Sequence, residues 1–112
     1  MEAAKKILSM FGMGTDPEQV TLAHQWVEEG ATLLDVRTPG EFGQGHVRGA
    51  LNVPVQVLGD RIADVPGARV VVYCRSGGRS ASAAKLLTRY GKEVLDLGPM
   101  RAWGRDEDIV LS

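Results

Sequence analysis

The most restrictive feature of the chain is a junction between an apolar run and a glycine-containing loop. Residues 70–73 are β-branched or aromatic, the loop follows at once, and a helical pattern begins near residue 80. A buried strand, a tight loop and a helix in this order are typical of an α/β domain with a parallel sheet. Because ligands of such sheets lie beyond the carboxyl ends of the strands, we expect a functional site in this loop.

The loop contains the only cysteine of the chain, Cys74, and two arginines, Arg75 and Arg79. Gly77 and Gly78 permit the backbone angles with which successive N–H groups surround an anion. The positive end of the following helix and the two guanidinium groups add further positive charge. All of these favour the thiolate, which is the nucleophilic form of cysteine. A lone cysteine is more often a small buried apolar residue, but such a residue needs neither the glycines nor the arginines. We therefore interpret Cys74 as a nucleophile.

Length and charge restrict the class of protein. A chain of 112 residues suits a single domain, and a net charge of −1 gives no indication of nucleic-acid binding. Residues 65–92 nevertheless contain six Lys or Arg and no Asp or Glu, so we expect a small anionic substrate. No run approaches the ~20 apolar residues of a membrane span. A single cysteine excludes an internal disulfide, which favours a reducing compartment and a cytoplasmic location.

Metal and nucleotide sites find no support in the sequence. The chain has no Cys/His cluster with metal-ligand spacing and no glycine-rich phosphate-binding fingerprint. We therefore expect no cofactor.

The pattern of the remaining chain predicts an α/β fold with a largely parallel sheet of about four to five short strands flanked by helices. An amphipathic stretch forms an N-terminal extension over residues 1–14, and the domain covers residues 15–112. A helix begins with Asp16 as N-cap, Pro17 at the first position and Gln19 in a capping box. We expect strands over residues 33–36, 51–53, 69–73 and 93–97, helical turns over 56–64, and a helix over 81–90 with Tyr90 facing inward.

Several polar residues outside the loop have two interpretations. Arg37 lies either near the site entrance or, as we favour, joins Asp35 in holding loops together through hydrogen bonds. Glu41 and His46 would suit an acid–base pair, but we favour turn chemistry for Glu41 and a buried ring bonded to a backbone carbonyl for His46. His24 is expected to be a partly exposed helix residue.

Three segments, in order and with matching spacing, resemble the signatures of the single-domain rhodanese family of sulfurtransferases. The first runs from Leu34 to Pro54, the second is the loop from Cys74 to Ser80, and the third is Leu97-Gly98 with Trp103. The likeness covers the chain from about residue 16 to 103. Two positions depart from the family pattern, Arg48 and Pro99, and neither lies in the loop.

The resemblance implies a rhodanese-like domain and an established reaction type. Cys74 attacks the outer sulfur of a donor such as thiosulfate and forms a persulfide, which a thiol or cyanide then removes. The loop binds the donor, with its amides and Arg75 or Arg79 on the oxygens, while Asp35, Arg37 and His46 support it. The other donor-binding positions are Ser76, Gly77, Gly78 and Ser80. We expect a monomer or a weak homodimer.

Other functions remain to be distinguished. A persulfide carrier that passes sulfur to a protein partner needs the same loop, so the sequence leaves that alternative open. A phosphatase or arsenate reductase is disfavoured, because the loop has six residues from Cys74 to Arg79 and the phosphatases that resemble it have one more. They also usually have His before the cysteine, where this chain has Tyr73. A non-catalytic binding module is disfavoured by the presence of Cys74.

Overall fold

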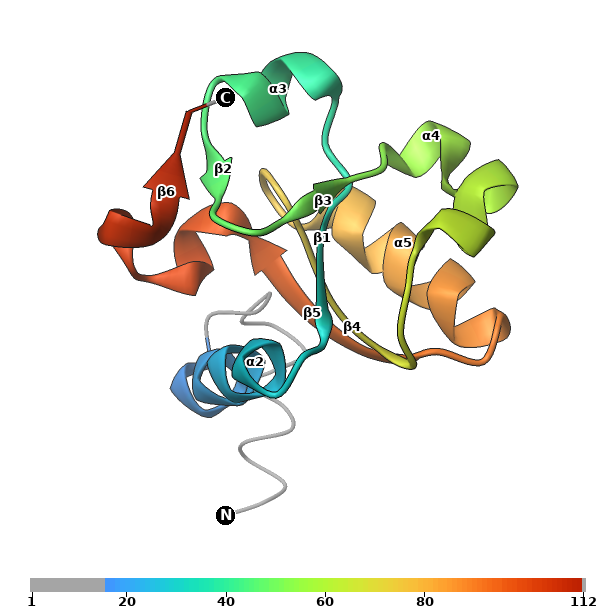
Figure 1. Ribbon diagram of the computed structural model, residues 1–112, viewed down its shortest axis with the longest axis horizontal. Coiled ribbons are helices and arrows are strands. Elements are labelled where there is room, and N and C mark those ends of the chain that lie inside the picture. Colours follow the sequence, from blue (N-terminus) through green and yellow to red (C-terminus); the bar gives the residue numbers. More distant parts are fainter. Residues whose placement is uncertain (1–15, 112) are drawn as a thin grey trace.

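The computed structural model describes residues 16–111, and the extension predicted over residues 1–14 lies outside them. Helices and strands are interspersed along the chain (Figure 1), as predicted for an α/β fold. The elements are α2 (Pro17–Glu28), β1 (Thr32–Asp35), α3 (Pro39–Gly43), β2 (His46–Val47), β3 (Leu51–Asn52), α4 (Val55–Leu58), η1 (Gly59–Asp64), β4 (Arg69–Cys74), α5 (Gly78–Arg89), β5 (Glu93–Pro99), η2 (Met100–Trp103), η3 (Asp106–Asp108) and β6 (Ile109–Val110).

The central sheet has the strand order β3-β1-β4-β5, and every neighbouring pair is parallel. This confirms the predicted largely parallel sheet. Helices cover both faces, with α5 on one side and α2 on the other (Figure 1). Strand β4 occupies an inner position, so the residue at its carboxyl end lies where such sheets bind ligands. That residue is Cys74.

The side chains of β4 point alternately to the two faces of the sheet and belong to two separate core clusters. Val70, Val72 and Cys74 belong to the cluster that contains Ala83 and Leu87 of α5. Successive strand residues point to opposite faces, so Val71 and Tyr73 belong to the second cluster, which contains Ala23 and Trp26 of α2. The period-2 pattern therefore directs the Cys74 side chain towards α5.

Helix α2 begins as predicted, with Asp16 as N-cap and Pro17 in the first turn. The predicted capping box is wrong: the Asp16 carboxylate accepts from the N2 amide, Glu18 N, rather than from the N3 amide that a capping box requires. Gln19 Nε2 donates to Asp96 O at 2.9 Å. This side chain therefore ties α2 to β5.

The helix after the loop differs from the prediction at both ends. It begins at Gly78, three residues earlier than the predicted residue 81, because Gly77 in the left-handed region serves as its N-cap. The inward orientation predicted for Tyr90 is wrong, since this residue is 58% exposed. Tyr90 is the C-cap, where the backbone leaves helical geometry, so the helical period no longer carries its side chain to the core.

Shorter segments surround the carboxyl ends of the strands. The turn predicted around Glu41 is the short helix α3, and the turns expected over residues 56–64 form α4 and η1. The antiparallel pairing of β2 with β6 was not predicted.

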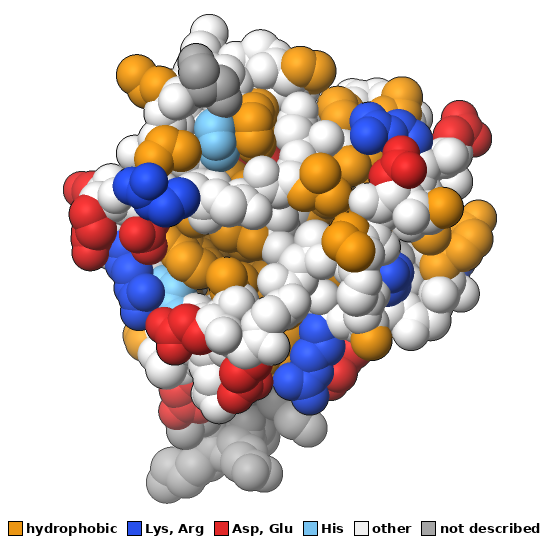
Figure 2. Space-filling model, viewed as in Figure 1, with side chains coloured by type: hydrophobic (Ala, Val, Ile, Leu, Met, Phe, Trp, Pro, Cys, Tyr) orange, Lys and Arg blue, Asp and Glu red, His pale blue; other side chains and the backbone are white. Residues whose placement is uncertain are grey.

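Hydrophobic side chains occupy the centre of the face in Figure 2, and charged side chains lie mostly around its margin. Among residues 16–111, no helix is long and apolar enough to span a membrane.

Candidate active site

Cys74 is the last residue of β4, and two backbone N–H groups point at its sulfur. Gly77 N lies 3.0 Å and Ser80 N 3.3 Å from Cys74 Sγ. Both donors stand at the start of α5, where the helix dipole also favours negative charge. The thiol is fully buried against the apolar cluster below α5. A cysteine buried among apolar groups alone is inert, whereas hydrogen-bond donors aimed at the sulfur stabilise its anionic form.

The backbone of Gly77 makes this arrangement possible. Its φ of 109° lies in the left-handed region, which residues other than glycine rarely adopt. Ser80 Oγ donates to Gly77 O at 3.1 Å, and Ala81 N donates to the same carbonyl. The loop is thus closed on itself around the sulfur. Its other predicted residues lie at the surface: Arg75, Ser76 and Gly78 are exposed.

Arg79 does not stand alone at the end of the loop but binds Glu41 of α3. Arg79 Nη1 lies 2.7 Å from Glu41 Oε1, and Nη2 lies 3.0 Å from Oε2. The hydrogen bond from Arg79, with smaller help from Thr38 and against the opposing effect of burial, lowers the pKa of Glu41 to about 2. The same hydrogen bond raises the pKa of Arg79. The pair is therefore ionised across the whole range in which proteins function.

The alternative pairing of Glu41 with His46 does not occur. His46 Nδ1 lies 2.9 Å from Phe42 O, the backbone-carbonyl contact expected for this residue, and the ring stacks on Phe42 at 3.6 Å between centroids. His46 is buried in β2. His24 is partly exposed as expected, and its Nε2 lies 2.8 Å from Trp103 O.

Asp35 and Arg37 form a buried ion pair beside the loop. Arg37 Nη2 lies 2.6 Å from Asp35 Oδ2 and also donates to Gly45 O at 2.7 Å. The guanidinium carbon lies 5.7 Å from the centre of the Tyr73 ring. These contacts join the end of β1 to the segment before β2. They agree with the interpretation that Asp35 and Arg37 hold loops together through hydrogen bonds.

A surface hollow of about 340 Å³ lies next to the loop. Arg75 reaches it from the loop, and Glu41 and Arg37 reach it from the segment after β1. Within residues 16–111, the Arg75 side chain has no hydrogen bond or ion pair. The lining residues are Arg37, Glu41, Gln44, Gly45, Arg75, Met100 and Ile109.

Two residues near the loop were not identified from the sequence as parts of the site. Asp96 of β5 accepts from Gly98 N at 2.9 Å; burial raises its pKa, and interactions with Ser80 and Gly98 partly offset the rise. Tyr73 Oη accepts a hydrogen bond from Val47 N at 3.1 Å. The Tyr73–Val47 contact joins residues 26 positions apart in the sequence, so no local pattern indicates it. For Glu41 a signal was present, because Thr38 and Glu41 have the spacing of a capping box.

Comparison with known proteins places the fold and the loop in a family. A sequence profile of the rhodanese-like domain matches residues 19–106. The chain is 42% identical over 80 residues to a protein named sulfurtransferase from Allochromatium vinosum, covering 69% of this chain and 75% of the relative. It is 36% identical over 104 residues to thiosulfate sulfurtransferase 16, chloroplastic, of Arabidopsis thaliana, covering 78% and 85%.

A solved structure agrees with these sequence relatives. The structure described as rhodanese with anions from E. coli superposes with a TM-score of 0.65 at 32% identity, covering 74% of this chain and all of that one. The profile spans most of the 112 residues, including both β4 and the complete loop with Cys74. The chain therefore belongs to the rhodanese-like family.

Proposed function

We propose that the protein is a sulfurtransferase that moves sulfane sulfur from thiosulfate or a similar anionic donor to a thiol or cyanide. The observation that carries this proposal is the convergence of Gly77 N and Ser80 N on Cys74 Sγ. Two amides at a helix N-terminus suit a reaction in which the sulfur is an anion both before and after transfer. The names of the Allochromatium and Arabidopsis relatives support the same reaction class.

The reaction proceeds in two displacement steps. The Cys74 thiolate attacks the outer sulfur of thiosulfate, the S–S bond of the donor breaks, and sulfite leaves with the bonding electrons. The terminal sulfur of the resulting persulfide is then attacked by the acceptor. Cyanide gives thiocyanate, and the Cys74 thiolate is regenerated with the electrons of the broken S–S bond. The loop amides stabilise negative charge on sulfur in both steps.

The donor's anionic end is bound in this proposal by the exposed part of the loop. Arg75 faces the hollow of about 340 Å³, and a guanidinium forms strong charge-assisted hydrogen bonds to sulfonate-like oxygens. Burial of Cys74 keeps bulk water from the persulfide, which protects it from side reactions. The six-residue spacing from Cys74 to Arg79 makes a small loop that suits a single sulfur atom.

A protein acceptor in place of a small thiol requires only the same persulfide. The cytoplasmic location and the monomeric or weakly dimeric state stay predictions from the sequence.

The test is a paired activity assay on the wild-type protein and Cys74→Ser. Thiosulfate and cyanide should give thiocyanate with the wild type only, because a hydroxyl is too weak an acid to replace the thiolate. An aryl phosphate should not be hydrolysed. Hydrolysis of the phosphate without thiocyanate formation would replace the proposal with a phosphatase.

A further inference from the structure

Among residues 16–111, Glu41 is the one carboxylate that forms an ion pair with an arginine of the active loop, yet the proposed reaction gives it no chemical role. Both carboxylate oxygens of Glu41 accept hydrogen bonds from Arg79, at 2.7 and 3.0 Å, in the bidentate geometry that fixes the orientation of a guanidinium group. The pair is only partly exposed, with 30% of the Arg79 side chain and 23% of the Glu41 side chain accessible. Solvent therefore screens it incompletely.

The carboxylate is also fixed from its own helix. Thr38 N and Thr38 Oγ1 each lie 3.1 Å from Glu41 Oε1, and Glu41 N donates to Thr38 Oγ1 at 3.2 Å. This is a complete capping box at the start of α3. Glu41 Oε1 thus accepts from three donors, and movement towards the loop would break the cap. Arg79 is held at a point set by α3 rather than by the loop.

Arg75 presents the opposite case. Its side chain is exposed, it lines the hollow, and within the described residues it has no ionic partner. Glu41 lines the same hollow, so its negative charge would repel an anionic donor if Arg79 did not neutralise it. The two loop arginines therefore meet different surroundings within five residues.

We propose that Glu41 is a positioning residue that holds Arg79 against α3, so that Arg75 is the loop arginine that meets the anionic substrate. Arg79 then fixes the loop and cancels the charge of Glu41, while Arg75 selects for anions. This inference rests on the proposed function for its substrate, but its geometry concerns any anion that approaches Cys74.

The test uses the charge preference of Cys74 alkylation, which does not depend on sulfur transfer. Cys74 is the only cysteine, so the rate with iodoacetate divided by the rate with iodoacetamide reports attraction of an anion at this one site. The variants are Arg75→Gln, Arg79→Gln and Glu41→Gln/Arg79→Gln. Thermal melting establishes that each is folded, and the urea-unfolded chains give the baseline ratio.

Arg75→Gln should lower the ratio by about tenfold, the effect of one charge-assisted contact. Arg79→Gln should also lower it, because Glu41 is left unpaired at the wall of the hollow. Removing that carboxylate as well should reverse the effect, so the double variant should recover at least half of the loss. A double variant with a ratio equal to or below that of Arg79→Gln would show that Arg79 itself meets the anion, and would overturn the inference.

Two further comparisons keep the outcome decisive. If Arg79→Gln does not fold, the double variant, which leaves no unpaired charge, is compared with Arg75→Gln. The inference requires a higher ratio of iodoacetate to iodoacetamide rates in the double variant. An equal or lower ratio overturns the inference. Thiosulfate kinetics on the same proteins should show the recovery in KM rather than in kcat. A wild-type protein without thiosulfate activity would refute the proposed function but leave the alkylation ratios as a valid test of Glu41.

Discussion

Gly77 N lies 3.0 Å from Cys74 Sγ, nearer than the other amide that points at the sulfur, Ser80 N at 3.3 Å. The contact exists because Gly77 has a φ of 109° and turns its N–H back towards the end of β4. The same residue is the N-cap of α5, so the loop conformation and the helix start depend on a single backbone position.

Gly77→Ala should therefore destabilise the protein and impair sulfur transfer. A side chain in this backbone region costs about 1–3 kcal/mol, and relief of the strain would turn the N–H away from Cys74. Urea unfolding and thiocyanate formation measure the two effects. The stability control is Gly78→Ala, since Gly78 is helical and a Cβ there meets no atom within 4 Å. Equal stabilities of the two variants would contradict the assignment of strain to Gly77.

Asp35→Asn should destabilise the fold strongly. The substitution leaves the Arg37 guanidinium buried without its anion, which costs about 3–5 kcal/mol. The control is Asp64→Asn, because Asp64 and its partner Arg61 are 56% and 43% exposed and such pairs contribute about 0–1 kcal/mol. A loss below about 1 kcal/mol for Asp35→Asn, measured by urea unfolding, would show that Arg37 finds another partner.

Acid stability should depend on Glu41. Its pKa is about 2 in the folded protein, against an ordinary value of 4.5 that applies to the unfolded chain, so the folded state favours the ionised form. The resulting stabilisation is complete above the unfolded value and is lost as the pH falls through 4.5 towards 2. Glu41→Gln should remove this part of the pH dependence.

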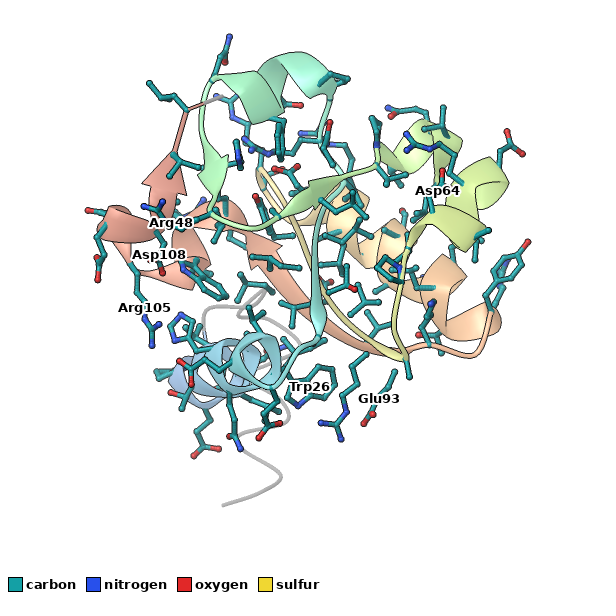
Figure 3. All side chains as sticks on the ribbon, viewed as in Figure 1. Trp26, Arg48, Asp64, Glu93, Arg105 and Asp108 are labelled. Carbon is teal, nitrogen blue, oxygen red and sulfur yellow. The ribbon has the colours of Figure 1, made fainter. Side chains whose placement is uncertain are left out.

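The measurement compares unfolding free energies at neutral pH and in the acid range. The wild type should exceed Glu41→Gln by about 1–2 kcal/mol at pH 7, and the difference should shrink on acidification. Glu93→Gln is the matched control, because the ion pair of Glu93 with Arg69 is exposed on both sides. This pair lies at the end of β4 opposite to Cys74, near the labels of Glu93 and Trp26 in Figure 3. A Glu41→Gln difference that does not change with pH would refute the ion-pair account.

Tyr73→Phe should weaken the attachment of β2 to the sheet. Val47 N donates to Tyr73 Oη in a buried position, and the lost acceptor should cost about 1–3 kcal/mol. Tyr90→Phe is the control, since Tyr90 is 58% exposed and should change stability by less than about 0.5 kcal/mol. Hydrogen exchange of the Val47 amide should accelerate only in Tyr73→Phe; an unchanged rate would mean that the amide gains another partner.

The parts of the structure that sequence predicts well are those with a local physical cause. The apolar run before Cys74 and the glycines after it predict a strand, a loop and a helix in the order observed, although the helix begins three residues earlier than predicted. The Asp16-Pro17 start of α2 follows from capping preferences in the same way. Alternation along β4 likewise accounts for which core cluster receives Cys74.

The parts that sequence misses depend on long-range contacts. Arg79 and Glu41 are 38 residues apart, and only the folded chain brings α3 over the loop. The pairing of β2 with β6 involves two strands of two residues each, too short to show a period. The capping box predicted at Gln19 is wrong, whereas Thr38 and Glu41, predicted to form a turn, make a complete capping box. The sequence therefore points to Cys74 as a candidate nucleophile but does not indicate the distant residues that hold its loop.

Intact-mass measurement of the reduced protein after incubation with thiosulfate shows whether Cys74 accepts a sulfur atom. The mass should increase by about one sulfur atom, and this gain should be removed by cyanide and absent in Cys74→Ser. A wild-type mass that thiosulfate leaves unchanged, or a gain that persists in Cys74→Ser, would contradict sulfur transfer through Cys74.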